Sequence, residues 1–312
     1  MNRANCFKID ISIQKDAPLV ESDKRSIFQL NCGHWYSIGD PVTIDADPFL
    51  FVHNDRLYLF YEDLHFYRFT GAIKMVSTSD LKHWTAPVEI THEPECHFSY
   101  PYVFEDKGEI YMMPETGWQN NIRLYKADRN DLSKFTLYKV ILQREKLDPN
   151  IEFDWCDSCF YRKDGLYYLI TTVKTKQQYE MQLYTSTQLE GSYTEHPMSP
   201  VVKGDDCARC AGSLMEKDGH IYRFAQDCSE AYGGQVSLFE IDEITPTAYR
   251  EHLVKKHILP TDQKFYRMGG HQVNFATFRG QTVVATDARD EATFYAERTV
   301  RKFFRTLHLL KF

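Results

Sequence analysis

The stretch Cys156–Thr171, CDSCFYRKDGLYYLIT, is an apolar run, an Asp-Gly turn at 164–165 and a second apolar run. Asp-Gly between alternating hydrophobic residues is the strongest short-range signal for a β-hairpin, because the tight turn needs positive φ at both central residues. The same arrangement recurs as DPFLFVHNDRLYLFYE from Asp47, YPYVFEDKGEIYMMPE from Tyr100, CAGSLMEKDGHIYRFAQD from Cys210 and GHQVNFATFRGQTVVATD from Gly270. The sequence therefore predicts five copies of one hairpin.

The copies are spaced as propeller blades are. Successive turns lie roughly 53 to 61 residues apart, the length of a four-stranded blade with its loops. After the hairpin, four copies continue with an alternating strand, a polar turn and an aromatic residue that opens an outer strand. These continuations are GAIKMVSTSDLKHWT from Gly71, NIRLYKADRNDLSKFTLY from Asn121, MQLYTSTQLEGSYTEHP from Met181 and QVSLFEIDEITPTAYRE from Gln235. We predict an all-β fold, a five-bladed β-propeller with four antiparallel strands per blade.

The fifth copy ends early, near Asp290. We expect the segment around Ile27 to Ile38 to supply its missing strand and to close the ring. No linker or change of composition divides the chain, so residues 1–295 are predicted to form one propeller domain.

The last residues, 296–312, have a different pattern and are predicted to form a short helix. Apolar residues fall at helical spacing at Val300, Phe303, Phe304, Leu307 and Leu310. Basic residues lie mostly on the other faces, at Arg298, Arg301, Lys302, Arg305 and Lys311. Two interpretations stay open: the apolar face packs on the propeller, or this basic amphipathic helix contacts a membrane surface or a partner.

The net charge and the N-terminal sequence limit the classes of protein to which the chain can belong. The net charge of −7 argues against nucleic acid as a partner, because binding to the phosphate backbone needs a basic face. The N-terminal residues have no apolar core of a signal peptide, and no stretch approaches 18 apolar residues. We therefore expect a cytoplasmic protein, or one peripheral at the inner membrane face through its C-terminal helix, with reduced cysteines.

The innermost strands of a propeller line its axis, and polar residues at their starts or inner faces point towards it. The repeat places there Asp47, Glu62, Tyr100, Glu115, Asp157, Arg209, Asp227, His271 and Asp287. Carboxylates are costly to bury unless they are paired or hydrogen-bonded. Two carboxylates facing each other across a cleft are the apparatus of glycoside cleavage. The alternative is that these residues bind one another, a water or an ion; as a set, they favour a polar ligand.

Two C-x-x-C pairs, Cys156 with Cys159 and Cys207 with Cys210, have ligand types that suit tetrahedral zinc. Their separation is far longer than that of a zinc ribbon, although the repeat places both pairs at the inner edges of adjacent blades. The other interpretation is buried thiols that act as small hydrophobes. We predict no other metal and no cofactor. His53, His65 and His97 show no ligand spacing and are expected on the surface or in loops.

The motifs resemble a known superfamily. IDADPFLFVHNDRLYLFYE, STSDLKHWT, CDSCFYRKDGLYYL and LEGSYTEHP are similar to the five-bladed glycoside hydrolases of the family 43 arabinanase and xylosidase group. SYPYVFEDKGEIYMMPET, RFAQDCSEAYGG and GGHQVNF more closely resemble the N-terminal propeller domain of plant glucosamine inositolphosphorylceramide transferases. Similar bacterial proteins belong to polysaccharide biosynthesis. The resemblance covers roughly residues 40–290.

The resemblance implies roles for particular residues. Asp47 matches the family 43 catalytic base, and Asp157 matches the aspartate that tunes the proton donor and orients the sugar. The blade-four glutamate that donates the proton is absent, and Arg209 stands in its place. Arginine cannot donate a proton at neutral pH. Substitutes are Glu115, Asp227 or His271, since a related family that hydrolyses agar oligosaccharides uses a histidine in blade five.

Arg209 also suggests an anionic group on the ligand, because its planar fork binds oxyanions bidentately. Glu62, Tyr100 and Asp287 are then candidates for binding the substrate. We expect an enzyme that hydrolyses or transfers a glycosidic bond in intracellular glycan or glycoconjugate assembly, with a carbohydrate or sugar nucleotide as substrate. The alternative is a non-catalytic propeller that binds a glycan or nucleotide sugar and positions a partner glycosyltransferase.

Overall fold

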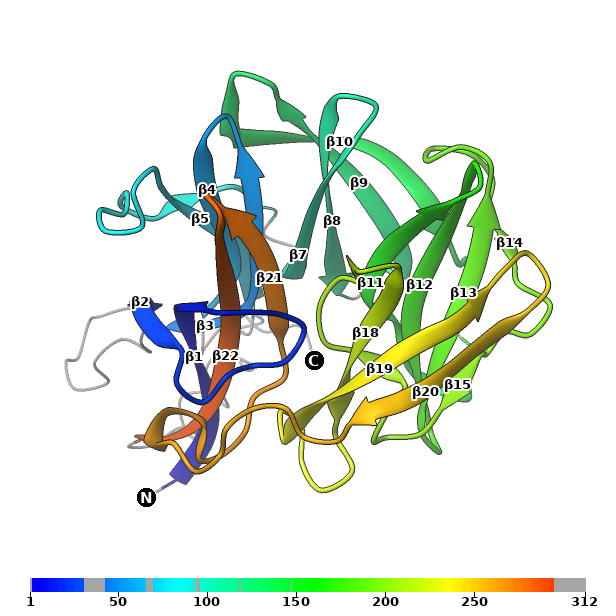
Figure 1. Cartoon of the computed structure of the whole chain (residues 1–312). Coiled ribbons are helices and arrows are strands. Elements are labelled where there is room, and N and C mark those ends of the chain that lie inside the picture. The colour runs from blue at the N-terminus through cyan, green and yellow to red at the C-terminus, as the bar shows by residue number, and fades with distance from the viewer. Residues whose placement is uncertain are drawn as a thin grey trace, which may run out of the picture.

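The computed structural model describes residues 2–30, 43–65, 70–91, 93, 96–117, 119–146 and 148–294. Their strands form five antiparallel sheets around a common centre (Figure 1). The predicted five-bladed β-propeller is confirmed. The helix predicted over residues 296–312 lies outside the described residues, whose one helical element is the short 3₁₀ turn η1 (Lys264–Tyr266). Within the described part of the chain, no helix has the length and apolar character that crossing a membrane requires.

The blades follow one another along the chain. Blade 1 contains β3 (Thr43–His53), β4 (Arg56–His65), β5 (Thr70–Thr78) and β6 (Val88–Glu89). Blade 2 contains β7 (His97–Asp106), β8 (Glu109–Gly117), β9 (Asn121–Asp128) and β10 (Asp131–Gln143). Blade 3 contains β11 (Ile151–Lys163), β12 (Leu166–Thr175), β13 (Tyr179–Ser186), β14 (Thr194–Glu195) and β15 (Val202–Lys203).

Blades 4 and 5 depart slightly from this pattern. In blade 4 the innermost strand is divided, so the blade contains β16 (Arg209–Cys210), β17 (Met215–Lys217), β18 (His220–Asp227), β19 (Gln235–Ile244) and β20 (Tyr249–Lys255). Blade 5 combines the two ends of the described chain: β21 (Val273–Phe278), β22 (Gln281–Phe294), β1 (Asn2–Gln14) and β2 (Arg25–Leu30).

The hairpin turns between the two inner strands have the geometry that the sequence predicts. In all five blades both central residues have positive φ, between 49° and 83°. These pairs are Asn54-Asp55, Lys107-Gly108, Asp164-Gly165, Asp218-Gly219 and Arg279-Gly280. Such turns match the twist of the flanking strands, so each hairpin can be formed locally.

Ring closure differs from the sequence expectation. One closing strand was expected from the segment around Ile27 to Ile38, but two strands close the ring. β1 pairs with β22 over residues 2–14, and β2, which contains Ile27, is the outermost strand. The strict alternation Phe7-Lys8-Ile9-Asp10-Ile11 explains why this segment forms a strand. The remainder of the expected segment lies outside the described residues.

Apolar side chains fill the spaces between neighbouring blades. The described residues contain five buried clusters: four lie mainly between two adjacent blades, and the fifth joins blades 3 and 4 and also includes Phe49 of blade 1 and Tyr100 of blade 2. Ile9 and Leu59, for example, join blades 5 and 1, and Leu124 and Leu169 join blades 2 and 3. The sheets therefore pack face to face, and their first strands converge at the centre.

Candidate functional site at the propeller axis

Three of the five innermost strands carry the same backbone irregularity. Asp47, Tyr100 and Asp157 each lie seven residues before the hairpin turn and have φ of 51°, 47° and 52°. At each position two residues oppose one residue of the next strand, which is a β-bulge. Positive φ is uncommon in residues other than glycine. The bulges redirect these three residues towards the axis.

Each bulged residue donates its backbone N–H to a carboxylate of the preceding blade. The N–H of Asp47 lies 3.3 Å from Asp287 Oδ2, that of Tyr100 lies 3.0 Å from Asp47 Oδ2, and that of Asp157 lies 3.3 Å from Glu115 Oε2. Three of the predicted carboxylates therefore link neighbouring blades.

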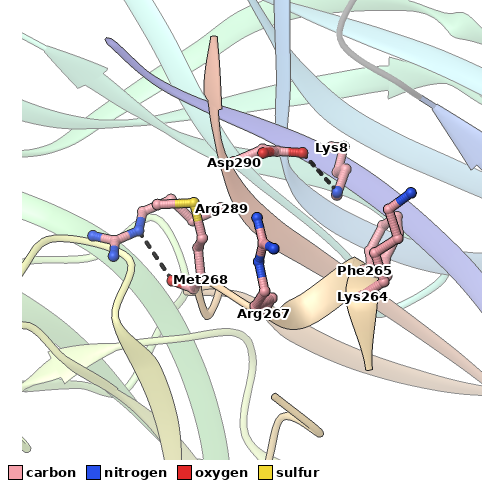
Figure 2. Close-up of a pocket in the computed structure, with 7 residues that line it drawn as sticks. All are labelled: Lys8, Lys264, Phe265, Arg267, Met268, Arg289 and Asp290. Carbon is pink, nitrogen blue, oxygen red and sulfur yellow. Dashed lines mark hydrogen bonds and ion pairs between the residues drawn. The ribbon is translucent and has the colours of Figure 1, made fainter. Parts of the chain in front are cut away.

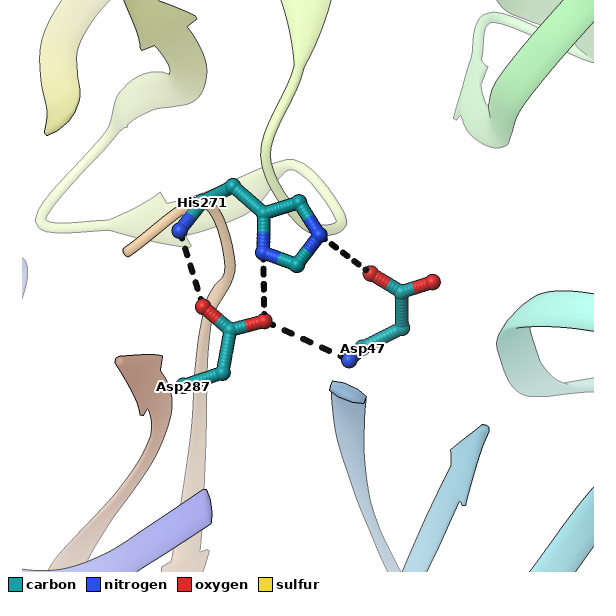
Figure 3. A group of neighbouring side chains, drawn as sticks. All are labelled: Asp47, His271 and Asp287. Atoms are coloured by element: carbon teal, nitrogen blue, oxygen red, sulfur yellow. Dashed lines mark hydrogen bonds and ion pairs between the residues drawn. The ribbon is translucent and has the colours of Figure 1, made fainter. Parts of the chain in front are cut away.

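His271 connects blades 5 and 1 (Figure 3). Its Nδ1 lies 2.6 Å from Asp287 Oδ2 and its Nε2 lies 3.4 Å from Asp47 Oδ1. Burial lowers the pKa of His271, but the neighbouring Asp287 and Asp47 raise it more, so the net shift is upward and favours the imidazolium. The ring of Phe7 stacks on the imidazole at 4.2 Å.

Asp47, His271 and Asp287 are also the residues that could hold a metal ion. One ligand atom from each lies within 4.8 Å of the others, and all three residues are buried. Both ring nitrogens of His271 face carboxylates, so the imidazole itself bridges the two acids.

Glu62, the second predicted carboxyl of blade 1, lies close to Asp47 in the same buried surroundings. Burial and the nearby charge of Asp47 raise the pKa of Glu62 well above its usual range. Burial raises the pKa of Asp47 itself to about 6. His97 Nε2 lies 3.5 Å from Glu62 Oε1, and its Nδ1 accepts the N–H of Gly71. His97, expected in a surface loop, is instead partly buried in β7, where burial lowers its pKa to about 4.

Asp157 forms a separate centre with residues of blade 4. Its Oδ2 accepts hydrogen bonds from Arg209 Nε at 2.5 Å and from Gln226 Nε2 at 2.9 Å. The guanidinium of Arg209 lies between the rings of Tyr179 and Tyr232, 5.4 Å and 5.0 Å from their centroids. Burial lowers the pKa of Arg209, but the charge of Asp157 together with Cys156, Tyr232 and Tyr179 raises it more, so the group stays a cation.

Glu115 is the acid that stands next to this ion pair. Burial and the charge of Asp157 raise its pKa to about 8, so the carboxyl is protonated at neutral pH. Unlike Asp47, Asp157 and Asp287, which are at most 5% exposed, Glu115 is only partly buried. Tyr232, whose ring lies 5.0 Å from the Arg209 guanidinium, is 40% exposed. The accessible face of the axis therefore offers a neutral acid, a cation and an aromatic ring.

Asp227 does not join the group in which the repeat places it. Its oxygens bind Ser229 Oγ at 2.5 Å and His257 Nε2 at 2.8 Å. Although burial raises its pKa, the hydrogen bonds from Ser229 and His257 lower it more. Side chains of a strand alternate between its two faces. Gln226, seven residues after the turn, is the residue that faces the axis and binds Asp157.

Counting seven residues forward from the end of a hairpin turn also identifies axial residues. In blades 1, 2 and 5 this position holds the predicted Glu62, Glu115 and Asp287. In blade 4 it holds Gln226, which the search for carboxylates does not predict. Tyr100 uses its hydroxyl to bind Gly212 N and O, at 3.0 and 2.8 Å, so it joins blades 2 and 4. Tyr232 comes from the loop between β18 and β19, and no repeat signal marks it.

The four cysteines considered for zinc do not come together. Cys156 Sγ donates to Thr172 O and Cys207 Sγ to Lys203 O. Cys159 and Cys210 are buried, and their thiols interact with each other. Among the described residues, none of the groups with metal-ligand spacing contains a cysteine.

The fold and the axis define a five-bladed β-propeller with a buried acidic centre and a partly open Arg-Tyr-Glu edge. The chain belongs to the family described as Glucosamine inositolphosphorylceramide transferase 1, N-terminal, whose model matches residues 27–282. It is 32% identical over 228 residues to Glucosamine inositolphosphorylceramide transferase 1 of Oryza sativa subsp. japonica and to that of Arabidopsis thaliana. These alignments cover 71% of this chain but 29% and 28% of the relatives, so the chain spans less than a third of their length.

Solved structures show the same fold at low sequence identity. An α-L-arabinanase of Cellvibrio cellulosa, complexed with arabinohexaose, has a TM-score of 0.53 and 15% identity over 67% of this chain and 77% of its own. A family 117 glycoside hydrolase of Zobellia galactanivorans has a TM-score of 0.55 and 12% identity over 81% of this chain and 86% of its own. At this level of identity the likeness supports the fold alone.

Proposed function

We propose that the propeller binds a carbohydrate at its axis and acts on a glycosidic bond, with Glu115 as the general acid and Asp47 as the base. One observation carries the proposal. Glu115 is a partly exposed carboxyl whose pKa of about 8 keeps the proton at neutral pH, next to the Asp157–Arg209 ion pair. Asp47 has a lower pKa, about 6. Carboxyls whose pKa values are pushed apart are the usual acid and base of such sites.

The surroundings favour Glu115 over the two other candidates for the acid. The lowered pKa of Asp227 makes it an ionised carboxylate, which has no proton to give. His271 holds its proton between Asp47 and Asp287, which stabilise the charged form and oppose proton release to a sugar. Within the described part of the chain, Glu115 accepts one hydrogen bond, from Asp157 N–H at its Oε2.

Arg209, Tyr179 and Tyr232 then bind the ligand. An aromatic face suits the apolar side of a sugar ring, and Tyr232 presents 40% of its surface. Asp157 holds the Nε of Arg209, so the Nη groups remain towards Tyr179 and the accessible edge. A carboxylate or phosphate on the ligand would fit the guanidinium fork.

The names of the relatives indicate the class of sugar to test first. They name glucosamine and inositolphosphorylceramide. We extend the proposal to a glucosamine-type glycan or glycoconjugate, handled during its assembly or remodelling, with transfer to a sugar or lipid-linked acceptor as the reaction in place of hydrolysis.

A second function is favoured by a specific observation. Asp47 accepts Tyr100 N–H with one oxygen and faces His271 with the other, and Asp287 accepts three backbone N–H groups. Carboxylates that already accept these hydrogen bonds join neighbouring blades and have few oxygen lone pairs left for proton transfer. On this account the propeller binds a glycan without turnover and presents it to a catalytic domain, which agrees with its covering less than a third of its relatives.

Binding and turnover measured together separate the two functions. The purified chain is screened by calorimetry against glucosamine, its glycosides, sugar nucleotides and inositol phosphates, and the ligands that bind are then incubated for turnover. Asp47→Asn keeps the oxygen that accepts Tyr100 N–H, and Glu115→Gln keeps the shape of the acid. Each should lower turnover at least about 100-fold and leave affinity within a few-fold.

Glu109→Gln is the matched control, because Glu109 lies in the same strand and pairs at the surface with Arg129 and Lys126. Glu109→Gln should change neither turnover nor affinity. Binding that Arg209→Ala abolishes, without turnover of any ligand, would establish the non-catalytic function. A chain that binds no carbohydrate in the screen contradicts both.

A further inference from the structure

A pocket at blade 5 is lined mainly by cations. It has a volume of about 390 Å³ and is formed by Lys8, Lys264, Phe265, Arg267, Met268, Arg289 and Asp290. They come from β1, from η1 and the residues after it, and from β22 (Figure 2). Four cations against one carboxylate leave a net charge of +3, in a chain whose own net charge is −7.

The single carboxylate does not neutralise the pocket. Asp290 Oδ2 pairs with Lys8 Nζ at 2.8 Å. Arg289 is held by backbone carbonyls, its Nε by Met268 O at 3.0 Å and its Nη1 by Tyr232 O at 3.1 Å. Of the five N–H groups of a guanidinium, these bonds use two. In the described part of the chain, Lys264 and Arg267 form no ion pair with any carboxylate and are exposed.

The pocket wall is fixed by the fold. Lys8 Nζ lies 4.7 Å above the Phe265 ring, and Arg289 N binds Gly269 O at 2.9 Å. The backbone of Gly269, with φ of +90°, packs so closely that a Cβ there would lie 1.8 Å from Gly234 O. Figure 2 shows Arg267 rising between Met268 and Phe265 towards the Lys8–Asp290 pair. Lys8 and Arg289 are therefore held in place before any ligand binds, and the exposed Lys264 and Arg267 lie at the same pocket.

We propose that this pocket binds a phosphate-bearing ligand, as a phosphomonoester or a diphosphate. Such groups carry about two to three negative charges at neutral pH, which matches the net charge of the pocket. Arginine and lysine together are the usual donors to phosphate oxygens. The volume suits a small-molecule group, and Phe265 and Met268 add an apolar wall for the part that carries the phosphate. The proposal does not depend on the sugar chemistry proposed for the axis.

Calorimetry with sodium pyrophosphate and with inorganic phosphate, at matched ionic strength against sodium acetate, tests the proposal. The whole chain should bind one pyrophosphate, more tightly than acetate. The double variant Lys264→Ala with Arg267→Ala should weaken pyrophosphate binding at least about tenfold, because two unpaired cations are removed. Asp290→Asn should strengthen it by removing the one carboxylate.

The matched control is Lys82→Ala with Lys176→Ala, which removes the same charge from two other exposed positions. It should bind pyrophosphate as the parent chain does. Absence of saturable 1:1 binding, an equal loss in the control, or equal affinity for acetate would overturn the proposal.

The phosphate could belong to a soluble molecule or to a lipid headgroup. Co-sedimentation with phosphatidylcholine vesicles that contain phosphatidic acid separates the two sources. Vesicle binding that pyrophosphate competes away and the double variant loses assigns the pocket to a headgroup. If pyrophosphate binds but vesicles do not compete for it, the ligand is soluble.

Discussion

At the scale of single residues, the axis separates into two electrostatic centres. Asp47, His271 and Asp287 form a closed, buried group in which an imidazolium bridges two acids. Asp157 and Arg209 form an ion pair next to a protonated Glu115, nearer the accessible edge. The first centre joins blades 5 and 1 and includes Asp47, the proposed base, whereas the second includes the partly exposed Glu115, the proposed acid.

Arg209→Ala should destabilise the fold because it leaves the Asp157 carboxylate buried with Gln226 as its remaining side-chain partner. Removing one member of a buried pair costs about 3 kcal/mol or more. Arg279→Ala removes the exposed pair with Asp55 and should cost much less, because solvent screens an exposed ion pair. Urea unfolding of the two variants measures the difference. Equal losses would show that the Asp157–Arg209 pair is not buried as described.

Glu115 makes stability depend on pH in a defined direction. Burial raises its pKa in the folded chain from the ordinary 4.5 to about 8, so the folded state holds the proton more tightly than the unfolded state. Its stabilising contribution is complete below pH 4.5 and is lost as pH rises towards 8. Glu115→Gln, which cannot ionise, should therefore gain stability relative to the parent chain across this window. Parallel unfolding curves at pH 5 and pH 8 would contradict the shift.

At the scale of elements, the hairpin is the unit that sequence reasoning can predict. Asp164-Gly165 and its counterparts encode the turn locally, and the first residues of the inner strands follow from it by counting. The repeat points to Asp227 as an axial carboxylate, but strand alternation turns its side chain away and puts its neighbour Gln226 on the axis. Tyr232 could not be predicted, since its loop is positioned by tertiary contacts alone.

Two glycines with positive φ should differ sharply when replaced. A Cβ at Gly165 would meet nothing within 4 Å, so Gly165→Ala should cost about 1 kcal/mol of backbone strain. A Cβ at Gly212 would lie 2.1 Å from Val273 O, where blade 4 contacts blade 5. Gly212→Ala should cost more than about 3 kcal/mol. Chemical denaturation of both variants gives the comparison, and similar losses would mean that this contact is loose.

At the scale of the whole molecule, closure of the ring joins the two ends of the described chain. β1 forms a continuous ladder with β22, and its Ile9 and Ile11 are fully buried between blades 5 and 1. The propeller follows from the repeat, but the choice of closing strands does not. Nothing in the fifth copy specifies its partner, and only the alternation of β1 suggests one.

Deletion of residues 1–30 should abolish cooperative folding, because it exposes the edge of β22 and removes one side of an apolar cluster. Thermal unfolding followed by circular dichroism should lose its sharp transition. A synthetic peptide of residues 1–30, added in trans, should restore part of it. A shortened chain that melts at the temperature of the full chain would exclude β1 as a structural part of blade 5.

The central claim is that the accessible edge of the axis, formed by Glu115, Arg209 and Tyr232, binds a sugar. The most direct measurement is a crystal structure of the chain soaked with the carbohydrate that binds most tightly in the calorimetric screen. The account predicts a sugar ring against Tyr232, with a hydroxyl or anionic group on Arg209 and the glycosidic oxygen within hydrogen-bonding distance of Glu115. A sugar bound elsewhere, with these three side chains untouched, would contradict it.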